Sequence, residues 1–110
     1  MSYIAMNRFM IRIGSEETFE TMWRERESRL KEVSGFQEFR LLKGPAGTHE
    51  GEDYRLYSSH VVWGSEADFV AWTKSQHFRD AHKNAGDTNA RAAFIGAPKF
   101  EGFETVLHED

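Results

Sequence analysis

The sequence predicts an α+β domain in which a four-stranded antiparallel sheet carries its helices on one face. Three observations lead to this fold class: alternating hydrophobicity in the first strand, helical periodicity in the segment after it, and the order of strands and helices along the chain. The chain has 110 residues, which is enough for one domain and too few for two. We therefore expect residues 1–110 to form a single domain.

The first strand is expected at Tyr3–Ile13, where apolar and polar side chains alternate. Its even positions include Arg8 and Arg12, and its odd positions carry Tyr3, Ala5, Asn7, Phe9, Ile11 and Ile13. A period of two is typical of a strand that buries one face. The odd positions are therefore expected to face the core.

An amphipathic helix is expected to follow Gly14 and to continue to about Glu32. Ser15 suits the N-cap position, and the two glutamates after it suit the positive end of the helix dipole. Apolar side chains then recur at helical spacing, at Phe19, Met22, Trp23, Leu30 and Val33. Ser34-Gly35 is expected to end this helical segment.

Three more strands are expected, at Phe36–Lys43, Tyr54–Trp63 and Phe100–Leu107. The polar, glycine-rich stretch between the first two of these predicts a hairpin connection. Because the helical segment comes before this hairpin and a second one follows it, the order is β-α-β-β-α-β. That order is the ferredoxin-like pattern.

The second helical region is expected to contain two helices. Ser65 and Asp68 resemble a capping box and predict a helix start. A second short helix is expected to begin at Ser75 or Gln76 and to run through Lys83. The segment Asn84–Pro98, with its glycines, proline and asparagines, is expected to be a loop.

The helices can cover only one face of the sheet, and the other face carries apolar side chains as well. The spacing predicts that this face is lined by Met6, Met10, Leu42, Val62 and Val106. An open apolar face would be a large exposed patch. We therefore expect a homodimer, a dimeric α/β barrel in which two sheets pack face to face.

Composition excludes several functional classes. A net charge of −4 argues against nucleic acid or an anionic membrane surface as a partner. The chain has no cysteine, so it has no disulfide and no thiolate nucleophile or ligand. No apolar run approaches the roughly 18 residues that a membrane span needs. We expect a cytoplasmic protein without a membrane span.

Asn7 is the first candidate functional residue, because it lies on an otherwise apolar strand face. A buried amide costs a few kcal/mol unless it is hydrogen-bonded. Two interpretations follow from the residue alone: a buried Asn satisfied by a backbone group, or an amide donor that points into a pocket.

Trp72 and His82 are the second and third candidates. One straight helix would hold them ~15 Å apart, and the expected bend at Ser75-Gln76 would bring them closer. Each also has an ordinary interpretation, since a helical Trp often packs in the core and a His at a helix C-terminus is stabilised by the dipole. A single imidazole that faces a flat apolar pocket suits haem iron better than zinc.

The whole pattern resembles the antibiotic-biosynthesis-monooxygenase superfamily, and within it the IsdG-like haem-degrading monooxygenases. The motifs that carry the resemblance are Ala5-Met6-Asn7-Arg8-Phe9, Gly35-Phe36, Val61-Val62-Trp63 and Phe69-x-x-Trp72-x-x-Ser75-x-x-Phe78-x-x-Ala81-His82. The combination of Asn7, Trp72 and His82 is similar to the catalytic set of the haem-degrading subgroup.

The resemblance implies a role for each of these three residues. His82 would be the axial ligand of the haem iron, Trp72 would press the porphyrin out of plane, and Asn7 would donate a hydrogen bond to the iron-bound oxygen. Haem would be both substrate and cofactor, and O2 and an external reductant, supplied by an electron-donating reductase, would be consumed. The candidate pocket walls, which are equally well explained as core, are Phe69, Phe78 and Phe94.

Two alternatives stay open at the level of sequence. One is a cofactor-independent monooxygenase of the same superfamily that acts on a quinol-like or polyketide aromatic. The other is non-enzymatic, a haem-binding carrier or a small dimeric stress domain. If the protein does bind haem, the loop Asn84–Pro98 is a candidate lid that orders on binding; contacts to the propionates are not assigned.

Overall fold

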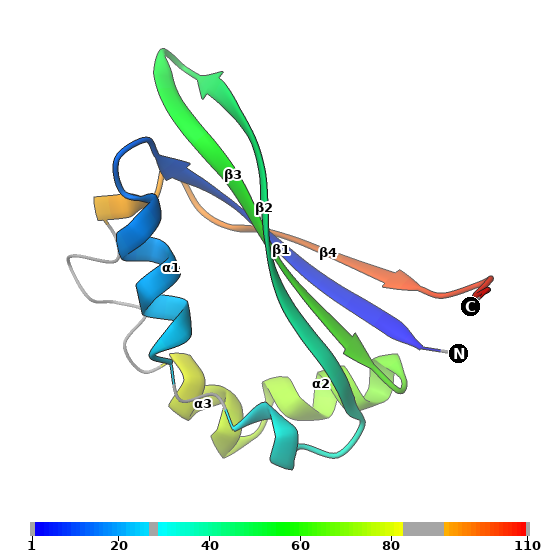
Figure 1. Cartoon of the computed structure of the whole chain (residues 1–110). Helices are drawn as coiled ribbons and strands as arrows, with labels where there is room; N and C mark the ends of the chain where they lie inside the picture. The colour runs from blue at the N-terminus through cyan, green and yellow to red at the C-terminus, as the bar shows by residue number, and fades with distance from the viewer. Residues whose placement is uncertain (1, 27–28, 83–91, 110) are drawn as a thin grey trace.

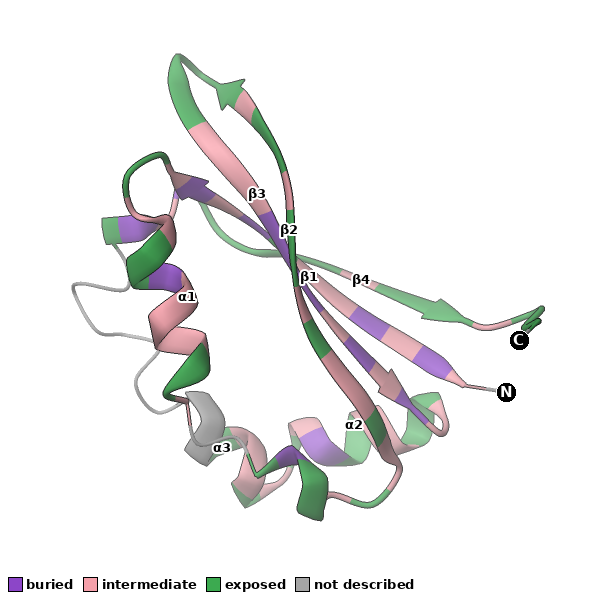
Figure 2. Cartoon of the chain, in the orientation of Figure 1, coloured by how far each residue is buried: buried purple, intermediate pink, exposed green. Residues whose placement is uncertain are grey.

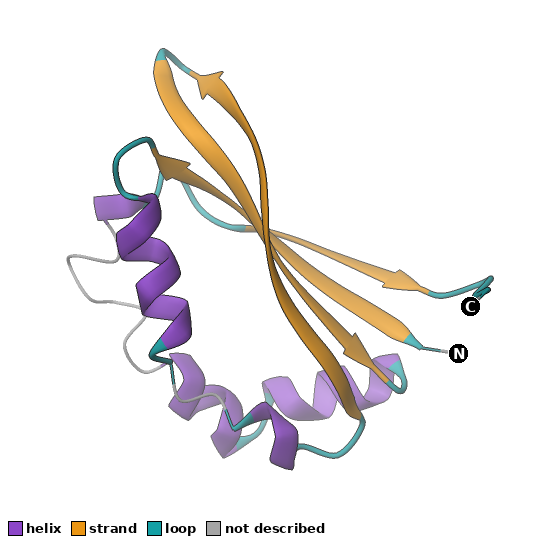
Figure 3. Cartoon of the chain, viewed as in Figure 1, coloured by secondary structure: helices purple, strands orange, loops and turns teal. Residues whose placement is uncertain are grey.

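The ferredoxin-like order is confirmed in the computed structural model, which describes residues 2–26, 29–82 and 92–109, with only the backbone for residues 80–82. The elements follow the chain in this order: β1 (Tyr3–Arg12), α1 (Glu16–Arg24), the 3-10 helix η1 (Leu30–Glu32), β2 (Phe36–His49), β3 (Glu52–Trp63), α2 (Glu66–Thr73), α3 (Gln76–His82) and β4 (Lys99–Glu104). Figure 3 separates these helices and strands by colour.

The four strands form one sheet in the order β2-β3-β1-β4. All the pairs are antiparallel, β1 with β3, β1 with β4 and β2 with β3. The helices follow one another in an arc along a single face of this sheet (Figure 1). Their apolar side chains are thus buried against one face, and the opposite face is left open.

The first helix is shorter than the periodicity predicts. α1 ends at Arg24 instead of continuing to Glu32, and Arg29 adopts a left-handed conformation with φ of 50° just before η1 begins. The two helical segments contribute to different parts of the core, Phe19 to one cluster and Leu30 to the other. Ser15 does occupy the N-cap but makes no side-chain capping bond, whereas Glu16 accepts from the Gly14 N–H at 2.7 Å.

The expected polar connection after Lys43 is strand instead. β2 continues to His49 through an irregularity in register between Lys43 and Ala46. Pro45 lies within this irregularity, where a missing N–H is tolerated. The turn itself is Glu50-Gly51, with φ of 48° and 83°, as a tight two-residue hairpin requires. The hairpin therefore extends beyond β1, as Figure 1 shows.

The C-terminal strand is shorter than expected. β4 ends at Glu104, and Val106 lies beyond it with 83% of its surface exposed. Val106 therefore does not line the open sheet face, which was the expectation. Phe103 occupies that face instead, because it pairs with Ile4 of β1.

The expected loop Asn84–Pro98 lies partly outside the described residues, at 84–91. Its described end is held against β1. The Arg12 guanidinium donates to the carbonyls of Ala92 and Phe94 at 2.7 and 2.8 Å, and the Ile95 N–H donates to the Met10 carbonyl at 2.8 Å. This part of the segment is anchored to the sheet.

The core consists of two hydrophobic clusters on the helix-facing side of the sheet. The first core cluster contains Tyr3, Ala5, Leu30, Val61, Trp63 and Trp72. The second core cluster contains Phe9, Ile11, Phe19, Tyr57 and Ala93. As Figure 2 shows, buried residues recur along the central strands, and buried positions also occur in α1 and α2. The odd positions within β1 thus face the core, as expected, with Asn7 between the two clusters. Ile13, which was also expected to face the core, lies beyond the end of β1 and is 49% exposed.

The opposite sheet face is open and partly apolar. Register places on it Ile4, Met6, Met10, Leu42, Leu56, Val62 and Phe103. Leu42 is 39% exposed and Phe103 is 46% exposed. Among the described helices, none has the length and apolar character that crossing a membrane requires.

Candidate active site

A row of residues across the strands separates the two core clusters. Its central residues, Asn7 and Ser59, are polar, and we call it the polar row. Asn7 of β1 pairs with Ser59 of β3, and the next residue of the row, on β2, is Leu41. Ser59 is 4% exposed, and its Oγ accepts from the Asn7 backbone N–H at 3.3 Å. On both central strands the neighbours two positions away on the same face belong to the hydrophobic clusters. Polar groups at the centre of such a face cost stability, so they are candidates for function.

The Asn7 side chain is left with hydrogen-bonding capacity. It is half-buried and faces the helices. Among the described residues, no hydrogen bond joins its amide oxygen or nitrogen to a partner. Of the two interpretations open from the sequence, this geometry favours an amide available to a ligand.

Ser75 produces the break between α2 and α3 that the sequence predicts. Its hydroxyl donates to the Trp72 carbonyl at 2.6 Å, which ends α2, and accepts from the Phe78 N–H at 3.2 Å, which begins α3. At the other end of α2, Ser65 Oγ accepts from the Asp68 N–H at 3.2 Å and forms the predicted cap. One hydroxyl therefore turns the chain between Trp72 and His82.

Trp72 is part of the first core cluster and is 7% exposed. Its ring lies 5.4 Å from that of Trp63 and meets the Phe78 ring edge-on at 4.9 Å. Ala5, the residue two positions before Asn7 on the same strand face, belongs to the same cluster. The indole is therefore held rigidly on the α2 side of the polar row.

The three candidate phenylalanines lie on both sides of the polar row. Phe69 stacks on Phe100 with ring centroids 5.5 Å apart, and Phe100 pairs with Asn7 across β4. Phe94 stacks on Phe9 at 5.8 Å, in the second core cluster. Phe78 packs against the first core cluster. All three contribute to the core. Phe69 and Phe78 lie on the side of the first core cluster, and Phe94 lies on the side of the second, across the polar row.

His82 is the last residue of α3. Its backbone is described, but its side chain lies outside the described part of the structure, so the predicted ligand role stays a prediction. The histidine that precedes it on the same helix, His77, is half-buried. Within residues 2–26, 29–82 and 92–109, no three His, Asp or Glu side chains come together to hold a metal ion.

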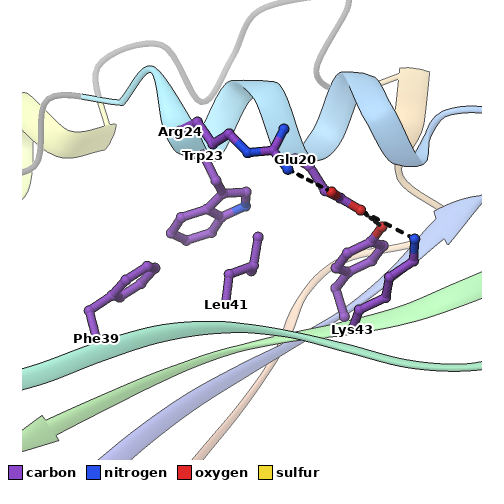
Figure 4. Close-up of a pocket in the computed structure, with 7 residues that line it drawn as sticks. Glu20, Trp23, Arg24, Phe39, Leu41 and Lys43 are labelled. Atoms are coloured by element: carbon purple, nitrogen blue, oxygen red, sulfur yellow. Dashed lines mark hydrogen bonds and ion pairs between the residues drawn. The ribbon is translucent and has the colours of Figure 1, made fainter.

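A cavity of about 310 Å³ between α1 and the sheet was not expected from the sequence. It is lined by Glu20, Trp23, Arg24, Phe39, Leu41, Lys43 and Tyr57. Figure 4 shows Trp23 reaching from α1 toward Phe39 and Leu41 on β2, and Glu20 reaching from the same helix toward Lys43. The Trp23 and Phe39 rings stack with centroids 5.5 Å apart. Leu41 also belongs to the row of Asn7 and Ser59, so the cavity adjoins that row.

The separate periodicities did place Trp23 on the buried face of a helix and Phe39 in a strand. Nothing in the sequence paired the two rings, because they are 16 positions apart and the register of β2 against the helix is a tertiary property. No local sequence pattern therefore predicts this cavity.

Glu20 organises the charges of this cavity. Its carboxylate accepts from the Tyr57 hydroxyl and forms ion pairs with Arg24 at 3.0 Å and Lys43 at 3.4 Å. The hydrogen bond from Tyr57 is the main reason that the pKa of Glu20 lies below its usual value. Burial and the bond to Glu20 raise the pKa of Tyr57, so Tyr57 acts here as a fixed hydrogen-bond donor.

Arg26 adds a further cation beside the cavity. Its guanidinium carbon lies 4.4 Å from the centroid of the Trp23 ring, a cation–π arrangement. Burial lowers the pKa of Arg26 to about 10. None of the described carboxylates forms an ion pair with it.

Comparison with known proteins assigns the chain to a family. Residues 2–84 match the model of the antibiotic biosynthesis monooxygenase family. The chain therefore belongs to that family of oxidoreductases, as the sequence motifs indicated.

The individual proteins that the chain resembles share less than 30% of their aligned residues with it. A staphylobilin-producing haem oxygenase from Staphylococcus haemolyticus is 28% identical over 91 residues, which cover 83% of each chain. Among solved structures, the haem-degrader MhuD from Mycobacterium tuberculosis, which has two haems bound in its active site, superposes with a TM-score of 0.68 at 23% identity, covering 98% of this chain and 99% of that one. SnoaB, a cofactor-independent oxygenase from Streptomyces nogalater, superposes with a TM-score of 0.65 at 19% identity, covering 97% and 95%. These superpositions confirm the fold.

The Tyr57–Glu20 bond gives the stability of the fold a testable pH dependence. Because the pKa of Glu20 is lowered in the folded state, its stabilisation is complete above the unfolded pKa and is lost as pH falls through the folded pKa. Tyr57→Phe should lower the free energy of unfolding by about 1.5–3 kcal/mol at pH 7 and by less near pH 3. Urea denaturation at both pH values measures this, with Tyr54→Phe as the control. An equal loss at both pH values would contradict the assignment.

Proposed function

We propose that this protein is a haem-degrading monooxygenase of the IsdG-like type, which binds haem and opens the porphyrin ring with O2 and electrons from an external donor. The observation that carries the proposal is the Asn7 amide, which lies between two aromatic clusters without a partner among the described residues. Membership in the monooxygenase family and the similarity to a staphylobilin-producing haem oxygenase support it.

The aromatic surroundings fit a flat apolar macrocycle. Rings gather on both sides of the polar row, and the adjoining cavity is at the lower end of the range for small-molecule pockets. A porphyrin in this cavity would extend beyond it toward Asn7. Haem, when bound, supplies an iron that binds and activates O2.

Each of the three candidate residues has a role that its own chemistry supports. His82, at the end of α3, would hold the iron with a neutral imidazole. Trp72, fixed by Trp63 and Phe78, is a rigid surface that can press on a ring without moving away. Asn7 would present an uncharged donor, which orients a bound oxygen atom without supplying an acidic proton.

The second candidate function is cofactor-independent oxygenation of an aromatic substrate. The observation that favours it is the Trp23–Phe39 cavity itself, which could stack an aromatic ring without haem, in a fold that it shares with SnoaB. Oxidation of a quinol-like substrate by the haem-free protein would select this function. Haem that binds but survives incubation with O2 and a reductant would select a haem carrier.

Substitution of His82 tests haem ligation. Absorption titration of the full chain with haem should give a Soret band at one haem per chain. His82→Ala should shift this band and weaken binding by at least about tenfold, because an axial ligand is lost. His77→Ala, on the same helix, should leave both unchanged. Identical spectra for the wild type and His82→Ala would refute the ligand role.

Substitution of Asn7 separates catalysis from folding. Asn7→Ala should slow loss of the Soret band under O2 and ascorbate by on the order of 10²-fold, the effect expected for a lost preorganised donor. The thermal unfolding temperature should stay the same or rise, because an amide without a partner becomes a methyl group. A large fall in stability with unchanged haem degradation would assign Asn7 to the core instead.

The open sheet face motivates a homodimer as part of the proposal. Leu42→Glu places a charge on that face and should convert a dimer into a monomer in analytical ultracentrifugation. Val70→Glu is a matched control, because Val70 lies on α2 and is also 39% exposed. A wild-type monomer, or a Leu42→Glu dimer, would contradict this assembly.

A further inference from the structure

The open sheet face carries a histidine among its apolar side chains. His60 of β3 pairs with Met6 of β1 and with Arg40 of β2, and β1 and β3 are the two central strands of the sheet. Because Met6 lies on the face that the helices leave open, its partner His60 lies on that face too. Leu56 and Val62 of β3 share this face with it.

The imidazole of His60 is already partly covered in the single chain. The side chain is half-buried, and its Nδ1 atom is buried without a hydrogen-bond partner among the described residues. A buried polar atom without a partner is unfavourable, and a charge at the same place costs more. A dry contact with a second molecule is therefore compatible with a neutral ring and is opposed by a charged one.

The charged groups around His60 leave no free carboxylate for a protonated ring. On the open face these groups are Arg8 of β1, Glu38 and Arg40 of β2, and Lys99 and Glu101 of β4. Glu101 forms an ion pair with Arg8 at 2.7 Å, and Glu38 forms one with Arg40. Both carboxylates are thus engaged, and a proton on His60 adds positive charge to a face that already carries three cations.

A second copy of this chain is the partner that suits the surface. Apolar side chains reach across the sheet to both edge strands, where Leu42 of β2 is 39% exposed and Phe103 of β4 is 46% exposed. The charges nearest His60 cancel within each chain as two ion pairs, so two such faces can meet without a net excess of one sign around the ring. This occupant is the homodimer of the proposed function, on which the inference rests.

We propose that His60 makes this homodimer sensitive to pH, so that the two sheets associate while the ring is neutral in both copies and separate when it is protonated. Histidine is the side chain that ordinarily changes charge between about pH 5 and 8. The dimer binds fewer protons than two separate chains, because its interface excludes the charged rings. Falling pH therefore shifts the equilibrium toward the separate chains.

The overall charge of the chain predicts the opposite direction. The net charge is −4 at pH 7 with all five histidines neutral, and it becomes less negative as they gain protons. Repulsion between whole chains therefore weakens as pH falls, which favours association. A dimer that weakens on acidification thus indicates a local charge at the interface.

Analytical ultracentrifugation of the full chain at pH 7.5 and pH 6.0, at equal ionic strength, tests the proposal. The dissociation constant of the wild-type dimer should rise about tenfold at pH 6.0, because two imidazoles, one in each copy, must lose their protons. His60→Gln, which has no titrating group, should change by less than about twofold. His60→Arg, which is charged at both pH values, should dimerise weakly at both.

A matched control uses another half-buried histidine. His77 lies on α3, among the helices on the other side of the sheet. His77→Gln should keep the wild-type rise. A wild-type constant that is equal or smaller at pH 6.0, or a full rise in His60→Gln, would overturn the proposal. Thermal unfolding of each variant at both pH values confirms that the chains compared are folded.

Failure of this inference can be told apart from failure of the proposed function. If the wild type is a dimer with the same dissociation constant at both pH values and Leu42→Glu is a monomer, the switch is wrong and the assembly stands. A wild-type monomer at both pH values overturns the assembly and the switch together. Haem degradation is decided separately, by His82-dependent loss of the Soret band at pH 7.5, because His60 lies on the face opposite Asn7.

Discussion

The polar row of Asn7 and Ser59 is the constraint on which the rest of the site depends. It divides an otherwise continuous apolar sheet face into two clusters, one around Trp63 and one around Phe19. A single cluster would pack to full density and leave no room for a ligand. The division costs stability, because polar groups replace apolar contacts at the centre of the face. The proposed binding site would give a physical reason for keeping this division.

The same division explains why both helical regions are broken. Helical side chains reach both clusters, with Phe19 of α1 in one and Leu30 of η1 in the other. The chain therefore ends α1 at Arg24 and restarts as η1. In the second region, the Ser75 hydroxyl ends α2 and starts α3 with two hydrogen bonds. The helical segments therefore follow one another in an arc along one face of the sheet (Figure 1).

The cavity has a positive rim because one carboxylate, that of Glu20, lines it together with two cations, Arg24 and Lys43. Among the described residues Glu20 forms the ion pairs with both rim cations, Arg24 and Lys43, and the hydrogen bond from Tyr57 lowers the pKa of its carboxyl group. The arrangement combines an aromatic wall, which a flat ligand can use, with two rim cations that are already paired with Glu20.

The sequence by itself determined the order of strands and helices, the core-facing side of β1 and the break before α3. The reason is that each depends on a local pattern: period-two alternation, helical spacing, or a capping residue such as Ser65 or Ser75. It also determined the family through motifs around Asn7 and Trp72. The continuation of β2 through Pro45, the end of α1 at Arg24 and the exposure of Val106 were decided by tertiary structure, because each depends on which strand or cluster lies opposite. The Trp23–Phe39 cavity, with its charges, exists only where a helix and a strand distant in sequence meet.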